Sequence, residues 1–265
     1  MLRALYSSAT GMKAQEMMID NTANNLANVN TPGFKRSRLD FADLVYTTHR
    51  TPGTAVGNGT VSPTGLQIGN GVRVVSSNKH FAPGMVEQTG HPLDLSIEGD
   101  GFFSVQVDNG ETRYTRAGAF RLDDQGRIVN GDGMLMMPPI TVPSGYDVNR
   151  ITIGADGTVQ GQQNGTDQAP AILGQIQITT FLNPSGLSSE GSNLFGATAA
   201  SGPPQQSNPG VLGFGTVRSG YLEGANVEVV TELISLISAQ RAYEINSRAI
   251  RAGDEMLSTS VDIVR

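Results

Sequence analysis

The sequence of 265 residues contains no cysteine and only three histidines. Without cysteine the chain can form no disulfide, no thiolate metal site and no cysteine nucleophile. The histidines are His49, His80 and His91, which fall in predicted loops and strand edges without the spacing that metal ligands require. We therefore expect no metal site and no histidine-based catalysis.

Charge is scarce as well. Charged residues make up 16% of the chain, the net charge is -6, and the basic residues are scattered. Nucleic-acid binding requires a concentrated basic surface, so we expect no nucleic-acid partner. Long apolar runs are missing: no stretch approaches the ~18 residues of a membrane span. The start, MLRALYSSATGMKAQEMM, also lacks the apolar core of a cleaved export signal.

The common motifs of enzyme and cofactor sites are absent. The glycine-rich stretches match neither G-x-x-x-x-G-K-[ST] nor G-x-G-x-x-G, and no G-x-S-x-G elbow occurs. The Asp-Gly pairs at Asp100, Asp132 and Asp156 lack the ligand ladder of a calcium loop and predict tight turns. We expect no catalytic residue, no cofactor and no small-molecule substrate. A triad assembled in space stays open, and Asp94 with Glu98 leaves a glycan-cleaving enzyme as an alternative.

Both ends of the chain carry a sevenfold apolar repeat. Such a period predicts helices wound against other helices along a narrow stripe. Near the N-terminus the repeat consists of Leu5, Met12, Ile19 and Leu26. Near the C-terminus it consists of Val229, Leu236, Tyr243, Ile250, Leu257 and Val264.

The stripes are thin. In the C-terminal helix the second seam reads Leu233, Gln240, Ser247, Asp254 and Val261, and three of these five residues are polar. A thin stripe buries little apolar area, so we expect both helices to fold only when other helices pack on them. Two ordinary amphipathic helices lying on a globular core are the alternative.

The middle of the chain changes to a period of two and is rich in glycine, which favours a turn-rich β domain. HPLDLSIEG places Leu93, Leu95 and Ile97 on one face of a strand. FFSVQVDNGETRYT predicts a hairpin that turns at Asp108-Asn109-Gly110, and NRITIGADGTVQG predicts another that turns at Asp156-Gly157. LGQIQITTFL predicts one buried strand.

The predicted fold class is α+β, with long heptad-bearing N- and C-terminal helices forming a coiled-coil-like inner domain and a central, mainly antiparallel β domain. The 36–71 segment is rich in Gly, Thr and Pro, and an extended segment of that length is uncommon unless it has a function. The predicted parts are an N-terminal helix at 1–35, an extended wall segment at 36–71, a β domain at 72–210, a return linker at 211–226 and a C-terminal helix at 227–265.

The stretch NNLANVNTPGFK ends the first helix with an unusual number of asparagines. Thr31-Pro32 forbids continuation of the helix, and Gly33 completes a turn, so simple fraying explains part of the pattern. It does not explain Asn21, Asn24, Asn25 and Asn28 on neighbouring helical turns. Side-chain amides donate and accept hydrogen bonds together, so we expect these residues to fix the register of the helix against its neighbours.

Three motifs together resemble the flagellar basal-body rod and hook family of bacterial axial proteins. SATGMKAQEMMIDNTANNLANVNTPGFKR is similar to the family's N-terminal signature, and NVEVVTELISLISAQRAYEINSRAIRAGDEML is similar to its C-terminal helix. HPLDLSIEGDGFFSVQ with YTRAGAF resembles its shared β-domain core. The resemblance covers nearly the whole chain, and SPTGLQIGNGVRV is most similar to the distal-rod members.

The resemblance implies a structural subunit that polymerises helically into the rod, the drive shaft that carries torque from motor to hook. It also implies passage through the flagellar type III export apparatus without a cleaved signal. The implied partners are further copies of the chain, proximal rod proteins, the hook protein and the outer ring proteins. A paralogous proximal-rod or hook protein, or a secreted β-domain binding module, remains the alternative.

The resemblance also assigns roles to residues. The N-terminal assembly helix has Leu5, Met12, Ile19, Asn24, Asn25, Leu26 and Asn28. The family turn has Thr31, Pro32, Gly33 and Phe34. The rod-stiffening segment has Ser62, Pro63, Thr64, Gly65, Leu66, Gln67 and Ile68. The C-terminal assembly helix has Val229, Leu233, Leu236, Tyr243, Asn246, Ile250, Leu257, Val261 and Val264.

Overall fold

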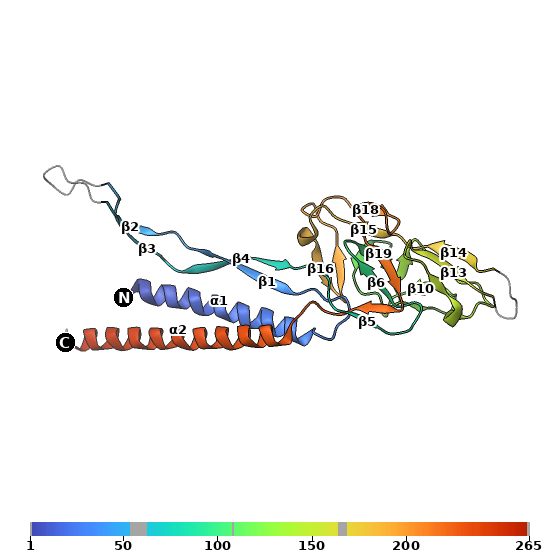
Figure 1. The fold of residues 1–265 in the computed structure, drawn as a ribbon. Coiled ribbons are helices and arrows are strands. Elements are labelled where there is room, and N and C mark those ends of the chain that lie inside the picture. Colours follow the sequence, from blue (N-terminus) through green and yellow to red (C-terminus); the bar gives the residue numbers. More distant parts are fainter. Residues whose placement is uncertain (1, 54–62, 108, 164–168, 264–265) are drawn as a thin grey trace. The chain divides into compact units, whose positions relative to one another are not determined.

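The computed structural model describes residues 2–53, 63–107, 109–163 and 169–263. One long α-helix lies near each end of the sequence, and short strands fill the middle (Figure 1). The helices and the central antiparallel β domain confirm the predicted α+β class. Neither helix is apolar enough, over the described residues, to cross a membrane.

The helices are α1 (Leu2–Ala27) and α2 (Val229–Ile263), with short 3-10 turns η1 (Val148–Arg150) and η2 (Pro184–Gly186). The first ten strands are β1 (Ser37–Asp43), β2 (Thr47–Arg50), β3 (Leu66–Ile68), β4 (Val72–Lys79), β5 (Val86–Gln88), β6 (Leu95–Glu98), β7 (Phe102–Gln106), β8 (Thr112–Thr115), β9 (Arg121–Leu122) and β10 (Ile128–Val129). The others are β11 (Leu135–Met137), β12 (Thr152–Ile153), β13 (Thr158–Gly161), β14 (Ala171–Gln175), β15 (Ile178–Thr180), β16 (Ser188–Gly191), β17 (Leu194–Gly196), β18 (Gln205–Ser207), β19 (Thr216–Ser219) and β20 (Tyr221–Glu223).

The chain forms two compact units. The helix–ribbon unit comprises Met1–Ala27, Ser37–Asn78 and Glu228–Arg265, and the β unit comprises Asn28–Arg36 and Lys79–Val227. These limits differ from the predicted parts. Residues 28–35, predicted with the first helix, belong to the β unit, because their hydrogen bonds go there. Residues 72–78, predicted in the β domain, belong to the helix–ribbon unit, because β4 pairs with β1.

In the helix–ribbon unit α1 and α2 run antiparallel, with both chain ends at the same end of the pair (Figure 1). β1 pairs with β4 and β2 with β3, and Leu44 donates its N–H to the carbonyl of Gly71 between the two pairs (2.9 Å). Residues 37–50 and 66–79 therefore make one long two-stranded ribbon beside α1. The described strands of the 36–71 segment, β1, β2 and β3, are extended and each is paired with another strand.

In the β unit the largest sheet has nine strands. Its main path runs β16-β17-β8-β7-β11-β10-β9, and β15 joins β7 to β18. Smaller sheets contain β12-β13-β14, β19-β6 and β20-β5. All the strand pairs of the β unit are antiparallel.

The turns of the β unit are built by Asp and Asn side chains. Asp123 accepts the N–H groups of Gln125 and Arg127, and Asn130 accepts those of Asp132 and Met134 in the same pattern. The predicted turn at Asp156-Gly157 joins β12 to β13, as expected. β7 and β8 form the other predicted hairpin, although Asp108 at its tip lies outside the described residues.

The core of the β unit confirms one strand prediction and corrects another. Leu93, Leu95 and Ile97 are all buried in the main apolar cluster. The stretch LGQIQITTFL, predicted as one strand, is divided between β14 and β15, which belong to different sheets. Two residues between them are enough to change sheets, and alternation alone does not reveal such a break. A second cluster contains Phe102, Tyr114, Phe181, Leu187 and Phe195.

Candidate assembly surfaces and the buried motif cluster

The contact between α1 and α2 has a fixed register with small residues on both helices. A β-carbon on Gly253 would lie 2.6 Å from Leu5 Cδ2, and one on Gly11 would lie 3.1 Å from Asn246 Nδ2. Further along, Asn25 Nδ2 donates to Glu232 Oε2 at 3.4 Å. The residue numbers rise on α1 as they fall on α2, as antiparallel packing requires. Close approach at the glycines brings the two backbones together.

The predicted assembly residues of the helices lie on more than one face. Leu5, Met12, Ile19 and Leu26 are half-buried, as are Asn28, Leu236, Asn246, Ile250 and Leu257. Asn24, Val229, Leu233 and Tyr243 are exposed, with Leu233 42% accessible. Val264 and the side chain of Val261 lie outside the described residues.

The second seam of α2 differs from the predicted one. The row that is buried with Leu236 and Ile250 contains Glu232, Ala239, Asn246 and Gly253, one residue before Leu233, Gln240, Ser247 and Asp254. Small and polar side chains fill it, so a search for apolar residues misses it. Asn246 faces Gly11 of the same chain, whereas Gln240 and Asp254 are exposed.

Asn25 explains much of the asparagine pattern at the end of α1. Its side chain is 1% exposed and bonds to β1 in both directions: Ser37 N–H donates to Oδ1 (3.0 Å), and Nδ2 donates to the Ser37 carbonyl (2.9 Å). Asn21 Nδ2 donates to the same carbonyl at 2.8 Å. With the Glu232 contact, Asn25 connects α1, β1 and α2. The register role of these amides stays a prediction.

Several apolar side chains of α2 are exposed. Such a row is the kind of surface that another helix covers in an assembly. Its members are Val230, Ile234, Ile237, Ile245 and Met256, which are 55% to 63% accessible.

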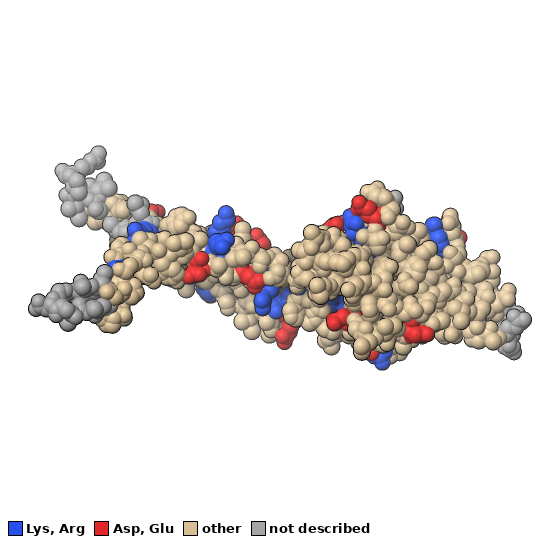
Figure 2. All heavy atoms as spheres, turned by 90° about the horizontal axis from the view of Figure 1, so that it is seen from above, with Lys and Arg blue, Asp and Glu red and all other residues tan. Residues whose placement is uncertain are grey.

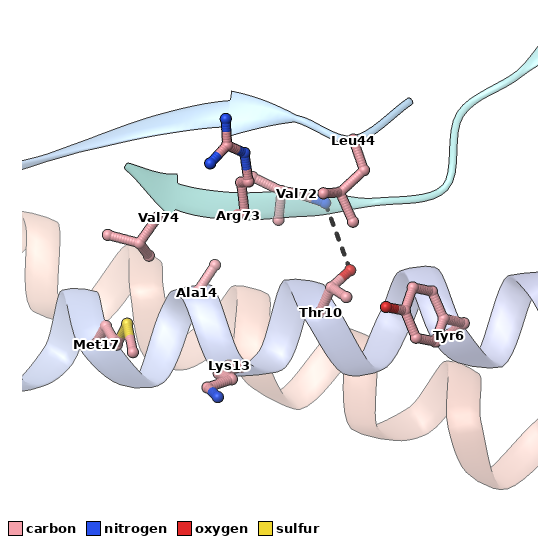
Figure 3. Close-up of a pocket in the computed structure, with 9 residues that line it drawn as sticks. All are labelled: Tyr6, Thr10, Lys13, Ala14, Met17, Leu44, Val72, Arg73 and Val74. Atoms are coloured by element: carbon pink, nitrogen blue, oxygen red, sulfur yellow. Dashed lines mark hydrogen bonds between the residues drawn. The ribbon is translucent and has the colours of Figure 1, made fainter. Parts of the chain in front are cut away.

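A groove of about 410 Å³ runs between α1 and the ribbon (Figure 3). α1 contributes Tyr6, Thr10 and Ala14, and β4 contributes Val72 and Val74. Thr10 is the polar contact across the groove, because the Val72 N–H donates to its Oγ1 at 3.4 Å. Gly71 lies so close to Thr10 that any side chain there would collide with it, so glycine is required at this crossing.

The predicted rod-stiffening segment lies in the β2-β3 part of the ribbon, beyond the β1-β4 pair. Leu66, Gln67 and Ile68 form β3 opposite β2, with Thr47 paired to Ile68. Leu66 and Ile68 are 52% and 44% exposed, and Val45 before β2 is 82% exposed. Pro63, Thr64 and Gly65 precede the strand, and Ser62 lies outside the described residues. The segment therefore presents apolar side chains on an extended arm.

The predicted family turn leads into a buried ion cluster that the sequence analysis did not identify. Lys35, Arg116 and Glu223 are each no more than 2% exposed. Lys35 Nζ lies 2.5 Å from Glu223 Oε1, and Arg116 Nη1 lies 3.3 Å from Oε2. The Gly84 N–H also donates to Oε1 at 3.0 Å. One carboxylate is shared by two cations.

Backbone acceptors complete the cluster. Lys35 donates to the Ala82 carbonyl at 2.8 Å, and Arg116 donates to the carbonyls of Ile97 (3.3 Å) and Gly99 (2.7 Å). Burial lowers the pKa of Lys35 below its ordinary 10.5, against the opposing effect of the Glu223 carboxylate. Burial likewise lowers the pKa of Arg116.

The turn residues hold this cluster in place. Thr31 donates its N–H to the Asn28 carbonyl (3.1 Å), and Asn193 Nδ2 donates to the Pro32 carbonyl (3.0 Å). Gly33 has a φ of +71° and donates its N–H to the Glu223 carbonyl at 2.7 Å. Phe34 is buried, with Lys79 Nζ 4.6 Å from its ring centre.

The acidic and histidine side chains considered as candidate catalytic groups bond to neighbouring side chains. Asp94 accepts a hydrogen bond from Thr89 Oγ1 (2.6 Å), and Glu98 pairs with Arg218 (2.8 Å). His49 bonds to Arg3 at 2.9 Å. Among the described residues, no three His, Asp or Glu side chains come together as metal ligands. Acidic and basic side chains are mixed on the face drawn in Figure 2, without a large area of one sign.

Comparison with protein families gives three matches in chain order. Residues 5–35 match the family "Flagella basal body rod protein", 96–161 match "Flagellar hook protein FlgE/F/G D1 domain", and 218–263 match "Flagellar basal body rod FlgEFG protein C-terminal". Together they include the predicted signature and most of α2.

Similar proteins extend over the whole chain. The chain is 43% identical to the flagellar basal-body rod protein FlgG of Borreliella burgdorferi, with 100% of both chains covered. It is 44% identical to FlgG of Caulobacter vibrioides, with 98% of each covered, and 40% identical to FlgG of Bacillus subtilis over 100% of both. A Bacillus subtilis flagellar hook-basal body complex protein, FlhP, is 30% identical.

Proposed function

Because the chain belongs to the family of flagellar basal-body rod proteins, we propose that it is the structural subunit of the distal rod. In this role it polymerises helically into the shaft that carries torque from motor to hook. The observation that carries the proposal is the full-length similarity to relatives named as rod proteins. The lower identity to FlhP favours the rod subunit over a paralogous hook-associated one.

The mechanism is folding coupled to assembly. α1 and α2 form the inner tube, and they become fully ordered when neighbouring copies cover their exposed apolar side chains. Heterologous, non-closing contacts then produce a filament. The row on α2 from Val230 to Met256 supports this proposal, since it exposes five large apolar side chains. The groove beside α1 offers a second surface of the same kind.

The other partners follow from the place of a rod subunit. The proximal rod proteins lie below it, the hook protein above it, and outer ring proteins around it. The subunit reaches this place through the flagellar type III export apparatus. It acts on no substrate and binds no cofactor.

Electron microscopy of isolated basal bodies tests the proposal. Deletion of the gene from its own bacterium should leave rods that end short and carry no hook, and the wild-type gene should restore both. A variant with Ile234→Asp and Ile237→Asp should be exported but fail to extend the rod, whereas Leu182→Asp on the β unit, at a side chain 89% exposed, is the control. Full-length rods with hooks in the deletion strain would refute the proposal.

A further inference from the structure

The chain passes between its two units four times, and all four passages are tied at one place in the β unit. The passages follow Ala27, Arg36, Asn78 and Val227. Three short segments of the β unit flank them: 33–36, 79–84 and 223–226. Segment 33–36 lies between the first two passages, segment 79–84 begins at the third passage, and segment 223–226 precedes the fourth.

Hydrogen bonds join the three segments to one another. His80 donates its N–H to the Arg36 carbonyl at 2.9 Å. Asn226 Oδ1 accepts the Arg36 N–H (2.7 Å), while its Nδ2 donates to the carbonyls of His80 (2.7 Å) and Ala82 (3.0 Å). One amide side chain therefore bonds to both other segments.

The ion cluster joins the same segments to the core of the β unit. Glu223 accepts from Lys35 of the first segment and from the Gly84 N–H of the second. Arg116, which follows β8, adds a bond to Glu223 and reaches the end of β6 through the Ile97 carbonyl. Arg116 directly follows β8 and bonds to the Ile97 carbonyl of β6, so the cluster requires both strands to be in place.

We propose that Lys35, Arg116, Glu223 and Asn226 form a junction clamp that brings the ends of α1 and α2 together once the β unit has folded. α1 ends at Ala27 and α2 begins at Val229, about 200 residues later, and closing so long a loop is entropically unfavourable. The clamp offsets this entropic cost of loop closure within a single subunit. Its action does not depend on polymerisation, so it can fail while the proposed function holds.

The natural absence of cysteine allows a direct test on the full-length protein. Ala27→Cys and Val230→Cys place spin labels at two exposed positions that adjoin the clamp segments in sequence, and pulsed electron resonance measures the distribution of distances between the labels. We expect a narrow distribution in dilute protein. Asn226→Ala should broaden it at least twofold while β7 and β8 keep their hydrogen-exchange protection. Glu98→Gln, at an exposed ion pair of the same unit, should leave it unchanged.

A second pair of variants tests the order of folding. Leu236→Asp, in the helix contact, should abolish helix protection and leave the β unit protected. Phe103→Ala, in the core of the β unit, should broaden the label distribution and reduce protection in both units. A distribution as narrow in Asn226→Ala as in wild type would overturn the clamp, as would loss of β-unit protection in Leu236→Asp.

Discussion

At the scale of single residues, Glu223 is the buried carboxylate at the centre of the ion cluster. It is 1% exposed and is the carboxylate that both Lys35 and Arg116 contact. Glu223→Gln keeps the shape of the side chain but leaves two buried cations without their anion. Breaking a buried ion pair from one side costs about 3–5 kcal/mol. We expect urea denaturation to show a loss of unfolding free energy in this range.

Glu98→Gln is the matched control, because its pair with Arg218 is half-exposed on both sides. Exposed pairs contribute about 0–1 kcal/mol, so this variant should change stability little. Equal losses of unfolding free energy in the two variants would show that the buried Glu223 cluster stabilises the protein no more than an exposed ion pair does.

Lys35 gives the stability a pH dependence at alkaline pH. Burial lowers the pKa of Lys35 in the folded protein, while in the unfolded chain it stays near 10.5. Between these values the folded state binds fewer protons, so the unfolding free energy contributed by Lys35 rises with pH. Urea denaturation should therefore show that the unfolding free energy of wild type rises relative to that of Lys35→Met between pH 8 and pH 10. Tyr114, whose pKa burial raises, is common to both proteins. A difference between them that stays constant with pH would contradict the prediction.

At the scale of elements, Asn25 determines how α1, β1 and α2 fit together. Asn25→Ala leaves the buried Ser37 N–H without its side-chain acceptor, and an unsatisfied buried group costs about 1–3 kcal/mol. Urea denaturation monitored by helix circular dichroism should detect this loss. Glu16→Ala, at an exposed position of the same helix, should change stability by less than about 0.5 kcal/mol. A loss from Glu16→Ala as large as that from Asn25→Ala would contradict the role assigned to Asn25.

The elements also show how far local sequence patterns reach. Periodicity predicts both helices, the hairpins of β7-β8 and β12-β13, and burial of Leu93, Leu95 and Ile97, because each depends on neighbours in the chain. The pairing of β1 with β4 connects residues separated by the 44–71 stretch, and the sequence there has little alternation. The row from Glu232 to Gly253 escapes notice because small and polar residues, not apolar ones, make the contact.

The buried ion cluster was beyond reach for a similar reason. Lys35, Arg116 and Glu223 come from three distant segments, and each is an ordinary charged residue within its own. Each also lies in an apolar and glycine-containing stretch of the sequence, GFKR, YTRAGAF and GYLEGAN. A charge in such surroundings is the available signal, but only the fold shows that the three charges meet.

At the scale of the whole molecule, order should decrease along the helices away from the junction. Among the described helix residues, the buried positions are Ala14, Thr22 and Asn25 on α1 and Glu232, Ala239 and Gly253 on α2, and four of the six lie in the helix halves that adjoin the junction in sequence. In dilute protein, trypsin should cut first after Lys13, Arg241, Arg248 and Arg251. Lys35, inside the junction clamp, should resist much longer. Mass spectrometry of timed digests would identify the fragments, and early cleavage at Lys35 would contradict this gradient.

We expect the two-stranded ribbon to affect the bending stiffness of the assembled shaft. Its far part carries exposed Val45, Leu66 and Ile68, so it can add contacts between stacked subunits and make the shaft resist bending. Deleting residues 62–70 alone would leave β2 without β3. Deleting 45–70 removes both strands and leaves β1 and β4 joined close to the point where Leu44 bonds to Gly71. We expect export and assembly to continue but the rods to curve in electron micrographs.

A matched variant, with Leu66→Ser and Ile68→Ser, keeps the strands and removes only the apolar side chains; it should show a smaller increase in curvature. Straight rods in the deletion would show that stiffness comes from the helices instead.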